Sequence, residues 1–378
     1  MRGVLALALV VLSAASAAAA TAAPSLRLGI TDSGNAYFSP PESFYPDLGR
    51  LHAKVLRVHL NWGGRLGVAT RRPADGADPG DPAYDWRRYD EIVLAAADEG
   101  VQVLFTIFGS PAWANGGQLP TRAPHRAADL VDFSFAAAQR YGGEFMREDG
   151  TVLPRVRYWT AWNEPNLTIG LVPQWKRAGG HWVIQSAIDY ARICNAVVEG
   201  VRGTLIPGER IACGDTGPRG NNAPTSERPT TSPIAFLRAM KRAGATGFDA
   251  YAHHPYPSGP SETPTTRPHG STAVTFGNLD TLVSEVTRLY GRKEIWLDEY
   301  GYQTNPPDND LGVTPAKQAR FLTESVALAR RNPRVTMLLW FLVRDEHRLI
   351  GWQSGLETWD GIRKPAFAAF QRAALASG

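Results

Sequence analysis

The sequence predicts a single-domain α/β fold, the (β/α)8 TIM barrel. Eight short apolar segments rich in β-branched residues recur along the chain, and an amphipathic segment follows each of them. Strands that alternate with helices predict a parallel sheet covered by helices. Eight such units in 378 residues, 43% of them hydrophobic, fit one closed barrel with one large core.

The eight predicted strands are residues 26–31, 55–61, 101–108, 156–162, 210–214, 248–253, 294–299 and 335–341. Apolar residues recur at helical spacing between them, as Tyr89, Ile92 and Ala96 do before Gly100. A doubly wound open sheet is the alternative fold. It would need a glycine-rich phosphate loop after an early strand, and residues 29–34 do not provide one.

Three long segments rich in Gly, Pro, Ser, Thr and Asn are predicted to be loops on one rim of the barrel. They are residues 215–232, 257–273 and 303–312, and each follows a predicted strand. In this fold the rim at the C-terminal ends of the strands holds the functional site.

Residues 1–23 resemble a secretory signal peptide and are set apart from the domain at 24–378. Met1-Arg2 is a short basic start, residues 4–12 are apolar, and the following small residues contain A-x-A sites with cleavage expected near Ala20. A single anchoring helix is the alternative, but the apolar part is shorter than the roughly 20 residues that span a bilayer. We therefore expect a secreted protein without a membrane span.

Charge and cysteine content exclude several classes of function. The formal net charge is +4 and the basic residues are scattered, so no stripe for nucleic acid is expected. Cys194 and Cys213 have neither metal-site nor redox-motif spacing, and they form either one disulfide or two buried thiols. We expect a monomer that needs no cofactor.

Two glutamates stand at the ends of predicted strands. Glu164 lies in "YWTAWNEPN" (158–166), and Glu299 lies in "EIWLDEYG" (294–301). Alternate residues of a strand share a face, so Leu297 and Glu299 are predicted to face the barrel interior, with Trp296 and Asp298 facing the helices. The fourth and seventh strands of a barrel lie on opposite sides of its mouth, so the two carboxyl groups can meet across it.

Paired carboxylates across a cleft are the groups that cleavage of a glycosidic bond needs. One protonates the departing oxygen, and the other meets the oxocarbenium-like centre at a carboxyl separation of about 5–5.5 Å in retaining enzymes. The alternative for either glutamate alone is a capping or salt-bridge role.

The chain resembles the clan A glycoside hydrolases, which are retaining (β/α)8 enzymes. Trp162-Asn163-Glu164-Pro165-Asn166 is similar to their acid/base motif, and 297–301 (Leu-Asp-Glu-Tyr-Gly) to their nucleophile motif. Within the clan, the sequence most resembles families 39 and 5, through residues 109–114 and 84–90. Asp298 departs from the clan, which more often has a small or hydroxyl residue there.

The resemblance implies a role for each candidate site residue. Glu164 would be the acid/base, kept protonated by repulsion from the ionised Glu299, and Glu299 the nucleophile. Further residues would bind the substrate or hold the nucleophile: Arg57 and Tyr256 as partners of Glu299, Asn163 as donor to the sugar 2-hydroxyl, His254 as an orienting residue or a sugar contact, and Trp340 as the floor of the first sugar site.

Trp62 and Trp113 are further candidates for stacking on sugar faces, with core packing as the alternative. Arg57 could instead form a buried ion pair at the barrel base, and Asn163 a turn before Pro165. His253, of opposite parity to His254, is expected outside the barrel.

Two other classes of function stay open. A metal-dependent hydrolase would use Asp249, His253, His254 and His269, although adjacent histidines on a strand point to opposite faces. A non-catalytic carbohydrate-binding barrel would lack one of the two acids, and here both are present. The predicted partner is a poly- or oligosaccharide. Sugar identity, linkage, exo or endo action and transglycosylation are not determined by the sequence.

Overall fold

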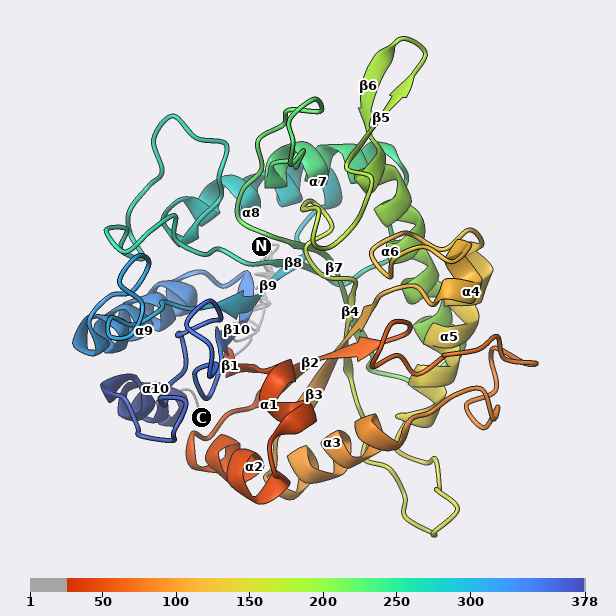
Figure 1. The fold of residues 1–378 in the computed structure, drawn as a ribbon, viewed down its shortest axis with the longest axis horizontal. Helices are drawn as coiled ribbons and strands as arrows, with labels where there is room; N and C mark the ends of the chain where they lie inside the picture. Colours follow the sequence, from red (N-terminus) through yellow and green to blue (C-terminus); the bar gives the residue numbers. More distant parts are fainter. Residues whose placement is uncertain (1–25, 377–378) are drawn as a thin grey trace, which may run out of the picture.

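The computed structural model describes residues 26–376, and eight parallel strands form a closed barrel (Figure 1). The predicted signal peptide and its cleavage site lie outside the described residues. Around the barrel the strands follow the order β1-β10-β9-β8-β7-β4-β3-β2. The strands are β1 (Arg27–Thr31), β2 (Val55–Asn61), β3 (Gln102–Phe108), β4 (Tyr158–Ala161), β7 (Arg210–Thr216), β8 (Ala250–His253), β9 (Glu294–Tyr300) and β10 (Val335–Phe341).

Helices surround the barrel and cover the outer face of the sheet (Figure 1). They are α1 (Ser33–Phe38), α2 (Pro41–Arg50), α3 (Arg87–Asp98), α4 (Ala112–Asn115), α5 (Ala127–Arg140), α6 (Gln185–Gly203), α7 (Pro233–Arg242), the 3-10 turn η1 (Phe276–Asn278), α8 (Leu279–Tyr290), α9 (Pro315–Arg331) and α10 (Pro365–Leu375). None of the helices between residues 26 and 376 is long and apolar enough to span a membrane. The predicted (β/α)8 fold is confirmed, and all eight predicted strands form.

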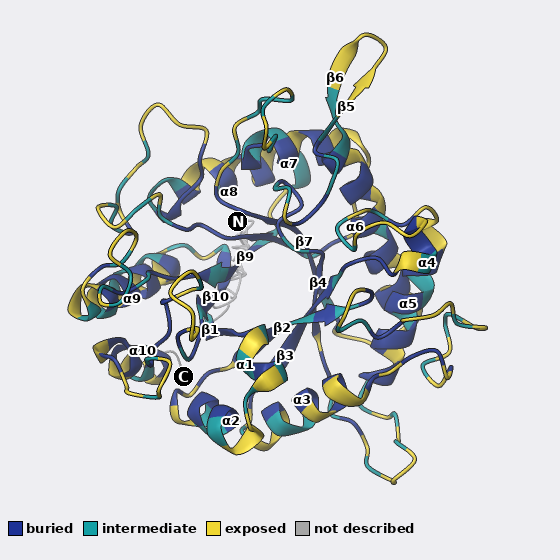
Figure 2. Cartoon of the chain, in the orientation of Figure 1, coloured by how far each residue is buried: buried dark blue, intermediate teal, exposed yellow. Residues whose placement is uncertain are grey.

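An antiparallel hairpin, β5 (Trp175–Ala178) and β6 (His181–Ile184), was not predicted. It projects from the barrel and is largely exposed (Figure 2). Its turn is Gly179-Gly180, with φ of 54° and 86°, and paired positive φ values are what a two-residue hairpin turn requires. The Gly-Gly pair was therefore a usable signal, but exposed strands lack the apolar pattern by which the barrel strands were found.

The apolar core has two parts, one on each face of the barrel sheet. The part inside the barrel contains Val55, Leu104, Tyr158, Ala212, Ala250, Ala252, Trp296, Met337 and Leu339. Ile295 and Leu297 belong to the larger part, which includes the apolar faces of the helices. The predicted facing of β9 was therefore wrong. Trp296 lies inside the barrel, and Asp298, which follows it by two residues, contacts Arg57 there.

A β-bulge explains this error. Between Leu297 and Tyr300, β9 advances three residues while its partner β10 advances two, from Leu338 to Trp340. The extra residue interrupts the alternation of faces. Asp298 and the next residue, Glu299, can therefore both contact Arg57, which an unbroken strand would not allow.

Cys194 and Cys213 form a disulfide that joins α6 to β7 across a sequence separation of 19. Replacing both cysteines by alanine is expected to lower the free energy of unfolding by about 3 kcal/mol, because closure of a loop of this size restricts the unfolded chain. The midpoint of urea unfolding measures the loss. Reductant should lower the midpoint of the wild type and leave that of the double variant unchanged. Equal midpoints for the oxidised wild type and the variant would contradict a stabilising role.

Candidate active site

Glu164 follows β4 in a turn that its neighbours hold in place. Trp162 and Glu164 have positive φ values of 67° and 41°, which non-glycine residues rarely adopt. The indole Nε1 of Trp162 donates to Gly170 O (2.8 Å), and Asn166 Nδ2 donates to Thr231 O (2.9 Å). Both side chains are fully buried. The Trp-Asn-Glu-Pro-Asn segment therefore supplies its own anchors and presents the Glu164 carboxyl group at the barrel mouth.

Glu299 stands near the end of β9 between two donors. Arg57 Nη1 donates to Glu299 Oε2 at 2.8 Å, and the Tyr256 hydroxyl donates to Oε1 at 3.1 Å. The Glu299 side chain is 13% exposed and that of Glu164 is 12% exposed. Both carboxyl groups are thus mostly shielded from water but open to the same pocket.

The two carboxyl groups lie close together. One oxygen each of Glu164 and Glu299 and a ring nitrogen of His254 all lie within 4.8 Å of one another. This separation leaves room for one atom between the carboxyl groups. Inverting enzymes need a larger separation, about 6.5–9.5 Å, to place a water between the two carboxyl groups.

Asn163 is oriented by two donors. Its Oδ1 accepts from Arg57 Nη2 (2.8 Å) and lies 3.2 Å from His59 Nε2. Burial, with the charge of Arg57, lowers the pKa of His59 to about 3, so the ring is neutral and its Nε2–H can donate to Asn163. With its oxygen used in this way, Asn163 presents its NH₂ group as a donor to the pocket.

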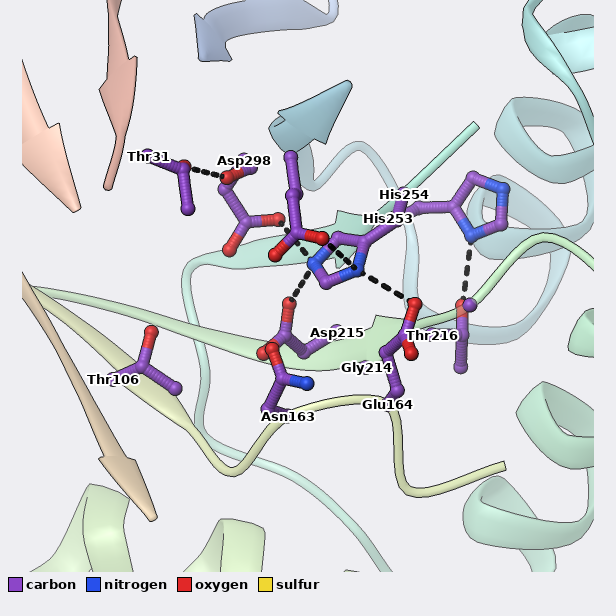
Figure 3. A network of polar contacts seen from close by, with 12 residues as sticks. Thr31, Thr106, Asn163, Glu164, Gly214, Asp215, Thr216, His253, His254 and Asp298 are labelled. Carbon is purple, nitrogen blue, oxygen red and sulfur yellow. Dashed lines mark hydrogen bonds and ion pairs between the residues drawn. The ribbon is translucent and has the colours of Figure 1, made fainter. Parts of the chain in front are cut away.

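His254 joins Glu164 to a second, deeper carboxylate (Figure 3). Its Nδ1 lies 3.0 Å from Glu164 Oε1 and its Nε2 lies 2.8 Å from Asp215 Oδ1. Burial opposes the charge, but the Glu299 and Asp215 carboxylates hold the pKa of His254 well above its usual range. Both ring nitrogens therefore donate. His254 is fully buried, so of its two predicted roles the geometry fits that of an orienting residue.

Asp215 was missed by sequence reasoning. It follows Gly214 in a second bulge, where β7 advances three residues from Cys213 to Thr216 and β8 advances two. Gly214 has a φ of 103°, and a glycine inside a strand often marks a bulge, which was the signal available. The bulge places the fully buried Asp215 against Arg57 Nη2 at 2.9 Å.

A pocket of about 580 Å³ opens above the two glutamates, and this volume is typical of small-molecule sites. Trp352, in the loop after β10, is 39% exposed. Its ring lies 5.3 Å from that of Tyr256. The lining includes Ser33, His59, Asn163, Glu164, Arg219, Tyr256, Glu299, Gln303, Phe341, Glu346 and Trp352.

Three predicted sugar-stacking tryptophans do not line this pocket. Trp62 is fully buried and stacks on Phe133, and Trp113 contacts Trp62 edge-on. Trp340 is 1% exposed and donates from Nε1 to Ser354 O. All three side chains face the helices instead of the pocket, and they pack with the core on the helix side of the barrel. Trp352 reaches the pocket from a loop, a position from which the sequence does not indicate the direction of the side chain.

The residues considered for a metal do not come together. His253 contacts Thr216 Oγ1 and Val274 O, and Asp249 pairs with Arg202. Among the described residues, two other clusters bring three ligand-type groups within reach of one ion: Glu164, His254, Glu299 and Asp215, His254, Asp298. Arg57 contacts an acid of each cluster, so a permanent positive charge already stands where a cation would bind.

Residues 233–361 match the family model described as the glycosyl hydrolase catalytic core. The matched segment contains β8, β9 and β10, and with them Glu299. A search of the curated proteins finds no match to the sequence.

Solved structures share the fold at low sequence identity. A family 39 glycoside hydrolase from Bacteroides cellulosilyticus WH2 is 19% identical with a TM-score of 0.62, and the match covers 93% of this chain and 64% of that one. A glucosidase from Croceicoccus marinus is 14% identical (TM-score 0.65; 94% and 68% covered). Xylanase 10B from Thermotoga maritima is 13% identical (TM-score 0.58; 93% and 95% covered). The chain thus spans less than two thirds of the family 39 enzyme.

The family model, the closed barrel and the paired carboxylates agree on one class of protein. The chain is a (β/α)8 barrel that is similar to a glycosyl hydrolase catalytic core over residues 233–361 and carries two paired carboxyl groups at its mouth.

Proposed function

We propose that the chain is a secreted, retaining glycoside hydrolase with Glu164 as acid/base and Glu299 as nucleophile. The observation that carries the proposal is the approach of the two carboxyl groups, since one oxygen of Glu164 lies within 4.8 Å of one oxygen of Glu299 at one pocket. Retaining enzymes need about 5–5.5 Å between carboxyl groups. The resemblance of residues 1–23 to a signal peptide supports secretion, and the proposed substrate is a poly- or oligosaccharide.

In the first step, a Glu299 oxygen bonds to the anomeric carbon while the bond from that carbon to the leaving oxygen breaks. Glu164 gives its proton to the leaving oxygen, so the products are a glycosyl ester and a free hydroxyl group. Arg57 and Tyr256 donate hydrogen bonds to the Glu299 carboxyl group and hold it in position. Because His254 donates to Glu164 Oε1, the transferable proton is on Oε2.

In the second step, Glu164 is a carboxylate and takes a proton from water as the water oxygen attacks the same carbon. The ester bond breaks, Glu299 leaves as a carboxylate, and the two inversions give net retention. In this proposal the Asn163 NH₂ group donates to the 2-hydroxyl of the sugar, and the partly exposed Trp352 side chain packs on a sugar ring.

The test is a hydrolysis panel of aryl β-glycosides (glucoside, xyloside, mannoside, galactoside) with plant and bacterial polysaccharides. The product anomer is followed by NMR, and a 2-fluoro glycoside traps the ester for mass spectrometry. We expect first-formed products of retained configuration and the label on Glu299. An inverted product, or a label on another residue, would overturn the mechanism.

Activity is also expected to survive prolonged treatment with a strong chelator, because the proposed steps use only protein side chains. The rate on the best substrate of the panel is measured before and after dialysis against EDTA. Loss of activity that is restored by one added divalent cation would favour a metal-dependent hydrolase instead.

A further inference from the structure

A layer of charged side chains lies beneath the two glutamates. Arg57, Asp215, His254 and Asp298 are each fully buried. They come from β2, β7, β9 and the residue after β8, and they lie on the same side of the sheet as the apolar residues inside the barrel. Ligand atoms of Asp215, His254 and Asp298 all lie within 4.8 Å of one another (Figure 3).

Asp298 is the member of this layer whose carboxyl group lacks hydrogen-bond donors. Both of its oxygens are buried and neither accepts a hydrogen bond of good geometry. Oδ2 lies 3.2 Å from Arg57 Nε, but that N–H is directed to Thr106 Oγ1 at 2.9 Å. Oδ1 lies 3.6 Å from His254 Nε2, which is directed to Asp215. A buried carboxylate without hydrogen bonds is costly, whereas a neutral carboxyl group can itself donate.

The donors of Arg57 are committed to other acceptors as well. Nη1 donates to Glu299, and Nη2 donates to Asn163 and to Asp215. An ionised Asp298 would therefore add a second negative charge beside Asp215 without gaining a donor of its own.

We propose that Asp298 is a positioning residue that keeps its proton and donates a hydrogen bond to Asp215, so that the pair carries one negative charge and orients His254 against Glu164. The catalytic part of this inference rests on the proposed role of Glu164. The chain of contacts then runs from β9 to the barrel mouth: Asp298 to Asp215, Asp215 to His254, and His254 to Glu164.

The charges around Asp298 agree with this assignment. Burial first, and then the Asp215 carboxylate, raise the pKa of Asp298 to about 8, against the opposing effects of Arg57 and His254. Burial also acts against ionisation of Asp215, but Arg57 and His254 hold its pKa below the ordinary value. The remaining titratable groups near the pair are Glu299, next in the chain, the Tyr190 and Tyr251 hydroxyls, and the imidazole rings of His59 and His253.

Stability gives a test that needs no substrate. Between its unfolded value of 3.8 and its folded value of about 8, Asp298 holds a proton in the folded state only, so the contribution of this group to stability falls as the pH rises. Asp298→Asn has no such proton. We expect the Tm of this variant relative to wild type to rise by several degrees from pH 4 to pH 8 and then level off. A difference that is constant over this range would overturn the proposal.

Kinetics at neutral pH separates the two aspartates. Asp298→Asn keeps a neutral donor to Asp215 and is expected to retain most of the wild-type kcat. Asp298→Ala removes the donor and should lower kcat by about 10²-fold with little change in KM, because the residue does not touch substrate. Asp215→Asn, the matched control, removes the charge and should be as damaging as Asp298→Ala.

The opposite pattern, in which Asp215→Asn is tolerated and Asp298→Asn is not, would place the proton on Asp215 and overturn the assignment. Equal effects of Asp298→Asn and Asp298→Ala would remove the role of the hydrogen bond. If the wild type hydrolysed no glycoside, the proposed function would fail, while the Tm measurement would still decide where the proton is held.

Discussion

Glu299→Gln is expected to lower kcat by about 10⁴-fold or more, which corresponds to at least about 5.4 kcal/mol of lost transition-state stabilisation. The amide has nearly the shape of the carboxylate and can still meet the Arg57 and Tyr256 side chains. It is a very poor nucleophile, so the covalent step is lost while the pocket keeps its form. Initial rates on the best substrate of the panel measure the effect.

A buried glutamate at the other end of the barrel provides the matched control. Glu209 precedes β7, pairs with Arg155 at 2.8 Å and accepts from the Trp159 indole. Glu209→Gln should lower Tm and leave kcat close to wild type, because Glu209 is remote from the pocket. If Glu299→Gln retained more than about a tenth of the wild-type rate, the assignment of the nucleophile would be wrong.

Small anions provide a second check on Glu299. In Glu299→Ala the side chain is removed, and azide can occupy the space and attack the anomeric carbon in its place. Restored turnover with a glycosyl azide of inverted configuration would identify the missing group as the nucleophile. Azide is not expected to change the rate or the product of Glu209→Gln, because that variant has lost no reacting group.

The strands of the barrel were predictable because each is a short, strongly apolar segment that ends in polar residues. Glu164 and Glu299 were found by the same logic, since a carboxylate where a buried strand ends is unusual. The alternation of faces along a strand does not predict the direction of side chains beyond a β-bulge. The bulge in β9 lets Glu299 as well as Asp298 contact Arg57, and the one at Gly214 turns Asp215 toward Arg57.

The prediction of which tryptophans line the pocket was wrong for a related reason. A tryptophan at the end of a strand can face either the pocket or the helices, and Trp62 and Trp340 face the helices. Trp352 reaches the pocket from a loop, whose path depends on contacts distant in sequence, such as Gln353 N to Gln303 Oε1 at 3.0 Å. Local sequence predicts where a strand ends, but tertiary contacts decide where a loop goes.

Glu164→Ala is expected to show an effect that depends on the leaving group. For substrates whose leaving group needs protonation, kcat/KM should fall by about 10²–10⁴-fold, the usual contribution of a general acid. For an activated aryl glycoside such as the 2,4-dinitrophenyl glycoside, kcat/KM should change little, because its leaving oxygen departs without a proton. Steady-state rates on a series of aryl glycosides measure this contrast.

Glu164→Ala should also slow the second step, in which Glu164 acts as the base. Without Glu164 as base, water attacks slowly, so the glycosyl ester on Glu299 should accumulate and produce a burst of released phenol. Azide, which needs no base, should raise kcat and give a glycosyl azide of retained configuration, opposite to the product of Glu299→Ala. Equal losses on activated and unactivated substrates, with no burst, would remove Glu164 from both proton transfers. The two glutamate variants therefore test one geometry from its two sides, because each should be rescued by the same anion with opposite stereochemistry.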